Sequence, residues 1–161
     1  MRHLLLVLAL VSAVTGCGGG GSKASGACGP EVREAFDPNS LQHVLPGGRA
    51  PTYLTNPPTS GPHVPGAAIT GVRTDVLDKP TQVGALEGGS VLVQYRDLSA
   101  ADVQRLESVA GDKVIVAPNP DLPDKVVATA WVFKRTCSAV DTAALTEFVT
   151  AHRGKGPGID G

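Results

Sequence analysis

The segment 56–66, NPPTSGPHVPG, restricts the fold more than any other stretch of this 161-residue chain. It places four prolines and two glycines in eleven positions. Each proline fixes φ and removes a backbone donor, so neither a helix nor a central strand runs through this segment. We therefore expect a rigid loop, and its single histidine, His63, is the side chain that such a loop could present to a ligand.

The first sixteen residues have the pattern of an export signal. A short basic start precedes the apolar run LLLVLALVSAV at 4–14, which is shorter than the roughly 20 residues that span a bilayer. The run leads into VTGC, and small residues directly before Cys17 resemble the lipobox of bacterial lipoproteins. The resemblance implies that residues 1–16 are removed and that Cys17 is acylated. An ordinary secretory signal with an incidental cysteine is the alternative.

The residues after Cys17 predict a tether. Residues 18–27 are rich in Gly, Ser and Ala and lack the apolar side chains that would order them. With the acylated cysteine, this predicts a protein held by membrane lipid at the extracytoplasmic face of the bacterial cell membrane. The expected organisation is a signal peptide at 1–16, a lipidated tether at 17–28, a globular domain at 29–154 and a mobile tail at 155–161.

Charge and aromatic content exclude some partners. The formal net charge is −1, so we expect no basic surface for nucleic acid. One Trp, two Tyr and three Phe argue against an aromatic-lined surface for sugars. Besides lipid, an envelope protein or a small molecule is therefore the expected kind of partner.

Cysteine usage predicts one disulfide bond. The chain has three cysteines, and assigning Cys17 to lipid leaves Cys28 and Cys137. An exported protein is in an oxidising compartment, where a bond between these two is the default interpretation. A redox-active pair is the alternative, but no Cys-x-x-Cys spacing supports it.

Regular structure is expected mainly in the second half of the chain. Residues 29–90 look mostly irregular, with a short helical turn at 31–36 and an extended piece at 43–48. Apolar runs predict three strands, which are 90–95, 113–119 and 125–137.

Two helices complete this predicted core. Ser99 and Asp102 form a capping box for a helix that should end at Gly111. Asp141 should cap a last helix that ends at Gly154, with an apolar face of Leu145, Phe148, Val149 and the core-edge His152. The order β-α-β-β-α predicts a single α+β (or α/β) domain whose first two strands are parallel and whose third returns as an antiparallel hairpin.

Five sequence blocks, in order, resemble the bacterial domain of unknown function 3105. They are QHV at 42–44, NPPTSGPH at 56–63, LEGG with VLVQY, VIVAPNPDLP, and VATAW, and together they cover about residues 40–150. The family pattern near 84–89 reads His-Ser-Leu-Glu-His-Gly. In this chain Gly84 and Gly88 take the places of both histidines, while Glu87 remains.

The resemblance implies a group of histidines and a carboxylate that could bind a transition metal or act as acid and base. In this chain His43, His63 and Glu87 remain for such a site, with zinc or copper as the metal. Because the two imidazoles are missing, the preferred hypothesis is a membrane-anchored, non-catalytic binding or accessory module without a cofactor. The alternative is a metal-binding protein or metal-dependent hydrolase-like enzyme using these three residues. A third interpretation is purely structural, with His63 and Glu87 hydrogen-bonded to backbone or to each other.

Overall fold

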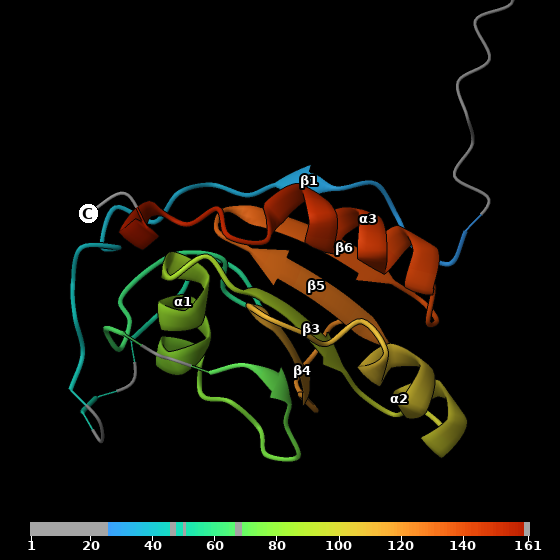
Figure 1. The fold of residues 1–161 in the computed structure, drawn as a ribbon. Coiled ribbons are helices and arrows are strands. Elements are labelled where there is room, and N and C mark those ends of the chain that lie inside the picture. The colour runs from blue at the N-terminus through green and yellow to red at the C-terminus, as the bar shows by residue number, and fades with distance from the viewer. Residues whose placement is uncertain (1–25, 46–47, 50, 67–68, 160–161) are drawn as a thin grey trace, which may run out of the picture.

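The computed structural model describes residues 26–45, 48–49, 51–66 and 69–159 (Figure 1). The predicted signal peptide, Cys17 and most of the tether lie outside the described residues. Within the described part of the chain, no helix is both long enough and apolar enough to cross a bilayer.

A six-stranded mixed sheet forms the middle of the domain (Figure 1). β4 is parallel to both of its neighbours, β3 and β2, and the other pairs are antiparallel. The strands, in their order across the sheet, are β1 (Val32–Arg33), β6 (Phe133–Cys137), β5 (Val126–Ala130), β3 (Val91–Tyr95), β4 (Val114–Pro118) and β2 (Gly71–Val72).

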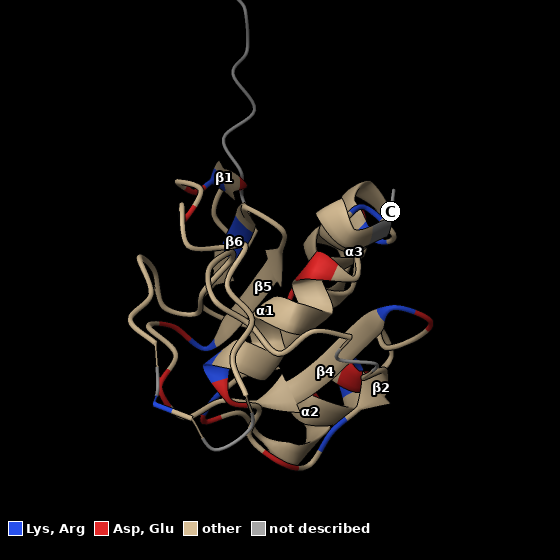
Figure 2. Ribbon diagram, turned by 90° about the vertical axis from the view of Figure 1, so that its left-hand side faces the viewer, with Lys and Arg blue, Asp and Glu red and all other residues tan. Residues whose placement is uncertain are grey.

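Helices cover both faces of this sheet. Successive side chains of a strand point to opposite faces, so Val91 and Val93 lie in one core with α2 and α3, whereas Leu92 lies in a second core with α1. All three side chains are fully buried. The helices are α1 (Lys79–Glu87), α2 (Ala100–Glu107), α3 (Thr142–His152) and the short 3-10 helix η1 (Pro157–Ile159). Basic and acidic residues are interspersed over the loops and strands (Figure 2).

The predicted α+β class of a single domain is confirmed, and so are its local signals. Ser99 Oγ accepts a hydrogen bond from Asp102 N, and Asp141 Oδ1 accepts one from Ala144 N. The predicted apolar face of the last helix is buried, at Leu145, Phe148, Val149 and His152.

His152 is a core-edge residue, as predicted. Its ring is stacked on Phe133 with a centroid separation of 4.4 Å, and its Nε2 lies 2.9 Å from Glu31 Oε2. This histidine therefore joins the N-terminal segment to α3.

The single strand predicted over 125–137 is wrong, because Trp131 and Val132 turn the chain between β5 and β6. Val132 has φ 57°, which is unfavourable for a β-branched residue. Its N–H donates to Thr59 O (3.0 Å) and its carbonyl accepts from Glu34 N (2.9 Å). Distant segments thus hold the turn, and no local glycine marks it in the sequence.

Three further local predictions are also wrong. β5 pairs with β3 rather than forming a hairpin with β4. Residues 31–36 were expected to form a short helical turn, but they contain the extended strand β1, which pairs with β6. α2 ends at Glu107 with Ser108 as its cap, so it stops before Gly111, and Leu106 is its one fully buried residue.

Helix α1 lies in a region that was predicted to be irregular. Asp78 caps it by accepting from Thr81 N at 2.8 Å, and Pro80 is in its first turn. The helix buries residues 82–86, so its sequence lacks the polar face that gives a helical period. An acidic cap followed by proline in the first turn is the signal that could have identified it.

The residues after α3 return to α1. Gly154, with φ 77°, donates its N–H to Gly89 O at 2.8 Å, and η1 then contacts α1. This packing was not predicted, because residues 155–161 were expected to form a mobile tail.

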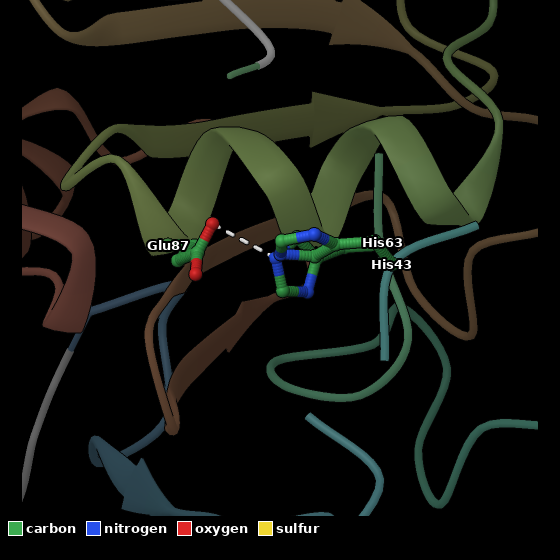
Figure 3. A group of neighbouring side chains, drawn as sticks. All are labelled: His43, His63 and Glu87. Atoms are coloured by element: carbon green, nitrogen blue, oxygen red, sulfur yellow. Dashed lines mark ion pairs between the residues drawn. The ribbon is translucent and has the colours of Figure 1, made fainter. Parts of the chain in front are cut away.

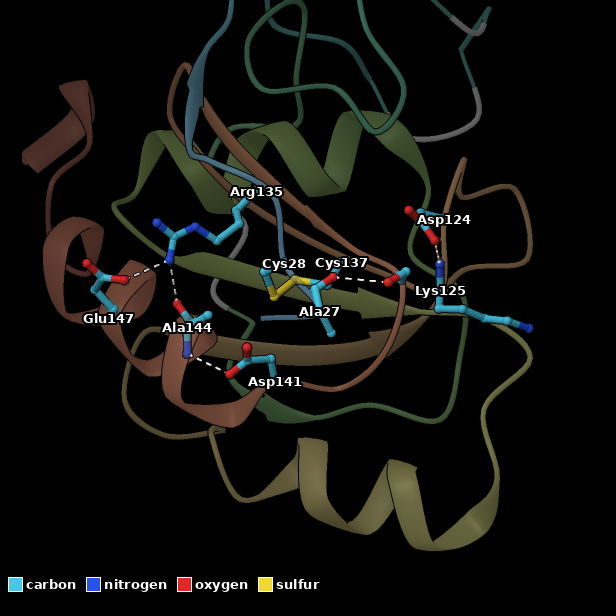
Figure 4. The surroundings of a disulfide bond; sticks show 10 residues. Ala27, Cys28, Asp124, Lys125, Arg135, Cys137, Asp141, Ala144 and Glu147 are labelled. Atoms are coloured by element: carbon cyan, nitrogen blue, oxygen red, sulfur yellow. Dashed lines mark hydrogen bonds and ion pairs between the residues drawn. A yellow bond between two sulfur atoms is a disulfide. The ribbon is translucent and has the colours of Figure 1, made fainter. Parts of the chain in front are cut away.

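The predicted disulfide bond between Cys28 and Cys137 is present (Figure 4). Both half-cystines are buried, and the bond joins residues 109 positions apart. Beside it, Gly29 N donates to Thr136 O at 2.9 Å. Arg135 on the same strand donates to Ala144 O and Glu147 of α3 (Figure 4). The N-terminal segment is thereby bonded to β6, and β6 is bonded to α3.

Candidate functional site

Backbone pairing brings His43 beside His63. Val44 N donates to His63 O at 2.8 Å, and His63 N donates to Gln42 O at 3.0 Å. The two segments run parallel at this bridge, and the imidazole rings lie edge to face with centroids 5.1 Å apart. His43 is exposed and His63 is fully buried.

Buried serines fix the proline loop to the segment that precedes it. Asp37 N donates to Ser60 Oγ at 2.9 Å. Ser40 Oγ accepts from Gly61 N at 3.0 Å and donates to Asp37 O at 2.6 Å. These bonds replace the backbone pairing that a proline-rich segment cannot make.

Gly61 and Tyr53 set the backbone just before His63, and neither residue was predicted to be part of the site. Gly61 has φ 130°, and a Cβ there would lie 2.9 Å from Tyr53 Cδ1. Tyr53 donates its hydroxyl to Pro62 O at 2.7 Å. Burial, and then the charges of Asp78 and Asp37, raise the pKa of Tyr53 to about 12, so the hydroxyl stays protonated and can donate. The glycine between Ser60 and Pro62 is the sequence signal that could have indicated this unusual backbone conformation.

Helix α1 supplies the carboxylate. Glu87 is its last residue, and Glu87 Oε2 lies 2.8 Å from His63 Nε2 (Figure 3). His43, His63 and Glu87 each offer one ligand atom, and these atoms all lie within 4.8 Å of one another. The structure therefore brings together the three residues that the sequence left separate.

One ring nitrogen of His63 has a defined role. Its Nδ1 lies 3.0 Å from Gly61 O, and because a carbonyl only accepts, Nδ1 carries the proton. In the neutral ring Nε2 then has a free lone pair. Within the described part of the chain, Nε2 makes no hydrogen bond of ordinary geometry, although Glu87 Oε2 is near.

A cavity of about 390 Å³ borders Glu87. Gly84, Gly88, Ser90 and Lys113 also line it. Gly84 is buried in α1, and Gly88 caps the helix. The cavity therefore lies beside the carboxylate, at the two glycines that the sequence analysis singled out.

Of the other residues that the sequence analysis singled out, the described ones, Cys28, Cys137 and the core-edge His152, are not members of this cluster. Cys28 and Cys137 form the disulfide bond, and Cys17 is outside the described residues. His152 pairs with Glu31 instead.

The fold and the site together define a class: a single α+β domain that gathers two histidines and a carboxylate at the end of a helix. The model of a family described as protein of unknown function (DUF3105) matches residues 44–160, and the chain belongs to this family. The match includes His63 and Glu87 and begins one residue after His43. No curated protein and no solved structure matches the chain.

Proposed function

We propose that this domain binds a divalent transition metal through His43, His63 and Glu87 as a non-catalytic binding or accessory module. We further propose that acylated Cys17 holds it at the extracytoplasmic face of the bacterial cell membrane. The metal proposal depends mainly on one observation, the buried Nε2 of His63. Among the described residues this atom makes no hydrogen bond of ordinary geometry, and it lies 2.8 Å from the Glu87 carboxylate and beside a second imidazole.

A purely structural ion pair accounts for this arrangement less well. It would require an imidazolium that donates from Nε2 to Glu87, and a buried charge needs good hydrogen-bond geometry to offset its desolvation. Nε2 lacks that geometry. A metal ion would instead accept the Nε2 lone pair and neutralise Glu87. The Nδ1 bond to Gly61 O is also the kind of outer contact that orients metal-binding histidines.

The distances suit a site that closes on binding. Ligand atoms at about 2.0–2.2 Å from a tetrahedral metal are roughly 3.3 Å apart. The 2.8 Å between His63 Nε2 and Glu87 Oε2 must therefore open slightly, and the widest separation of 4.8 Å must shorten. His43 is exposed, so its ring is free to rotate toward the other two ligands.

The ligand types favour Zn²⁺ or Cu²⁺. Imidazole nitrogen and carboxylate oxygen suit both ions, and neither a thiolate nor a thioether is part of the cluster to select Cu⁺. Three protein ligands leave one position on zinc for water or another ligand.

A hydrolytic role has less support than binding. A metal-dependent hydrolase commonly needs a general base beside the metal-bound water. Among the described residues, the cluster contains one carboxylate, Glu87, and metal binding would use it as a ligand.

Metal titration of the purified full-length protein tests the metal-binding proposal. After chelator treatment and dialysis, we expect one equivalent of Zn²⁺ or Cu²⁺ by elemental analysis. His63→Ala and Glu87→Gln should lose it. His152→Gln and Glu147→Gln are matched controls, because both residues lie outside the cluster and should retain binding. Absence of stoichiometric metal in the wild type, or full binding by His63→Ala, would refute the proposal.

Fractionation tests the anchor separately. Cys17→Ser should abolish incorporation of labelled fatty acid and release the protein from membranes. Unchanged labelling of this variant would exclude acylation at Cys17.

A further inference from the structure

The chain after α3 crosses the end of α1 at very close range. Gly154 N donates to Gly89 O at 2.8 Å, immediately past the helix. A Cβ at Gly156 would lie 2.5 Å from Gly89 N and 2.7 Å from Leu86 O, and closer still to Glu87 O. These neighbours are backbone atoms, which cannot rotate away, so any residue larger than glycine at 156 would push the two segments apart.

Gly158 contacts the Glu87 side chain itself. A Cβ at this position would lie 3.3 Å from Glu87 Cγ and 3.6 Å from Glu87 Cδ. Gly158 and Glu87 also share the wall of the 390 Å³ cavity. The segment 154–158 therefore limits the directions in which the Glu87 carboxylate can turn.

The Glu87 side chain needs such support more than that of His63. His63 is fully buried, with Nδ1 bonded to Gly61 O. Glu87 is the last residue of α1, and 27% of its side chain is exposed. Lys113 Nζ also donates to Gly88 O at 3.1 Å, so a second segment holds the end of α1.

We propose that residues 154–158 form a strap that positions Glu87 for metal binding. This inference rests on the proposed function. The contacts above require glycine at 156, and a larger residue at 158 would displace Glu87 slightly. It acts through Glu87 and supplies no ligand itself.

Single alanine substitutions in the full-length protein test the strap. Gly156→Ala and Gly158→Ala should weaken Zn²⁺ binding about 10- to 100-fold, the usual effect of disturbing a contact that orients a ligand. Gly111→Ala is the matched control, because no heavy atom lies within 4 Å of a Cβ there and its affinity should be unchanged.

A spectroscopic readout separates positioning from general destabilisation. With Cu²⁺ bound, the electron paramagnetic resonance spectra of both strap variants should shift toward that of Glu87→Gln, which lacks the carboxylate. Gly158→Ala makes the milder contact and is the decisive variant if Gly156→Ala does not fold. Wild-type affinity and a wild-type spectrum for Gly158→Ala would overturn the strap.

Failure of the strap and failure of metal binding are distinguishable. If the wild type binds no metal, the proposed function is refuted, and the strap is judged on the metal-free protein. The ring ¹⁵N resonances of His63 should then shift in Gly158→Ala and stay in place in Gly111→Ala, because the nearby carboxylate moves only in the former. Unchanged His63 resonances in Gly158→Ala would overturn the strap.

Discussion

Removing the disulfide bond should cost the domain a large part of its stability. Cys28 and Cys137 are 109 residues apart, so the bond closes most of the folded chain into one loop. On the chain-entropy model, a loop of this length stabilises the folded state by about 4.8 kcal/mol at 25 °C. Small domains have a total free energy of unfolding of about 5–15 kcal/mol. The bond is therefore expected to decide whether the protein stays folded under stress.

Urea unfolding followed by the fluorescence of Trp131 measures this contribution. The full-length protein is compared before and after reduction, and with Cys28→Ala/Cys137→Ala. Reduction alone should lower the free energy of unfolding by about 4–5 kcal/mol. The double variant should lose roughly 1 kcal/mol more, because it also removes two buried sulfur atoms.

Hydrogen exchange locates the effect. Without the bond, the contacts that hold the segment before residue 34 include the two-residue strand β1, the hydrogen bonds of Ser138 to Ala27 O and of Gly29 to Thr136 O, and the pair of Glu31 with His152. Its amides should exchange before those of the central strands. A loss below about 1 kcal/mol on reduction, with unchanged exchange near Cys28, would refute the loop-closure reasoning.

Three other substitutions have definite expected outcomes. Gln94 is fully buried, and among the described residues neither polar atom of its amide has a hydrogen-bond partner. Gln94→Leu should therefore raise the free energy of unfolding by about 1–3 kcal/mol in urea titrations. A decrease would indicate that the amide makes hydrogen bonds in solution. Unfolded tyrosine ionises near pH 10, whereas the pKa of Tyr53 is raised to about 12, so between these values the unfolded state binds fewer protons and stability falls as pH rises. For a partly solvated ring, Tyr53 contributes up to about 2 kcal/mol to this loss of stability. The contribution should be absent in Tyr53→Phe, and equal losses in both proteins would contradict the assignment of the effect to Tyr53. A Cβ at Gly88 would make only ordinary contacts of 3.6 Å with Ala85 O and 3.7 Å with Gly84 O, so Gly88→His should fold. It should bind Zn²⁺ at least about tenfold more tightly by calorimetry, and unchanged affinity would contradict a metal position beside residue 88.

Much of the fold could be predicted because its signals are local. The strands β3 and β4 are short apolar runs, and Ser99 and Asp141 are side-chain caps whose partners are three residues away. The disulfide bond followed from counting cysteines in an exported chain. None of these predictions required knowledge of a distant contact.

The elements that were missed depend on distant contacts. The turn at Val132 is held by Thr59 and Glu34, far away in the sequence. Helix α1 is buried too completely to show a helical period. For the same reason, His63 and Glu87 could be identified as candidates from the sequence, but their contact could not be predicted. Their contact requires α1 to be a helix and the proline loop to lie against it, with Val64 N bonded to Pro80 O at 3.1 Å.

The position of the disulfide bond has a mechanical consequence. Tension applied at the N-terminal end of the chain enters the domain at Cys28 and crosses directly to Cys137, at the end of β6. When the opposing force acts at the C-terminus, the load bypasses residues 29–136. His43, His63 and Glu87 all lie within this bypassed stretch. Pulling the two ends apart should therefore first draw residues 154–158 away from the end of α1 and then strip α3 from the sheet, while the backbone between Cys28 and Cys137 stays outside the covalent load path.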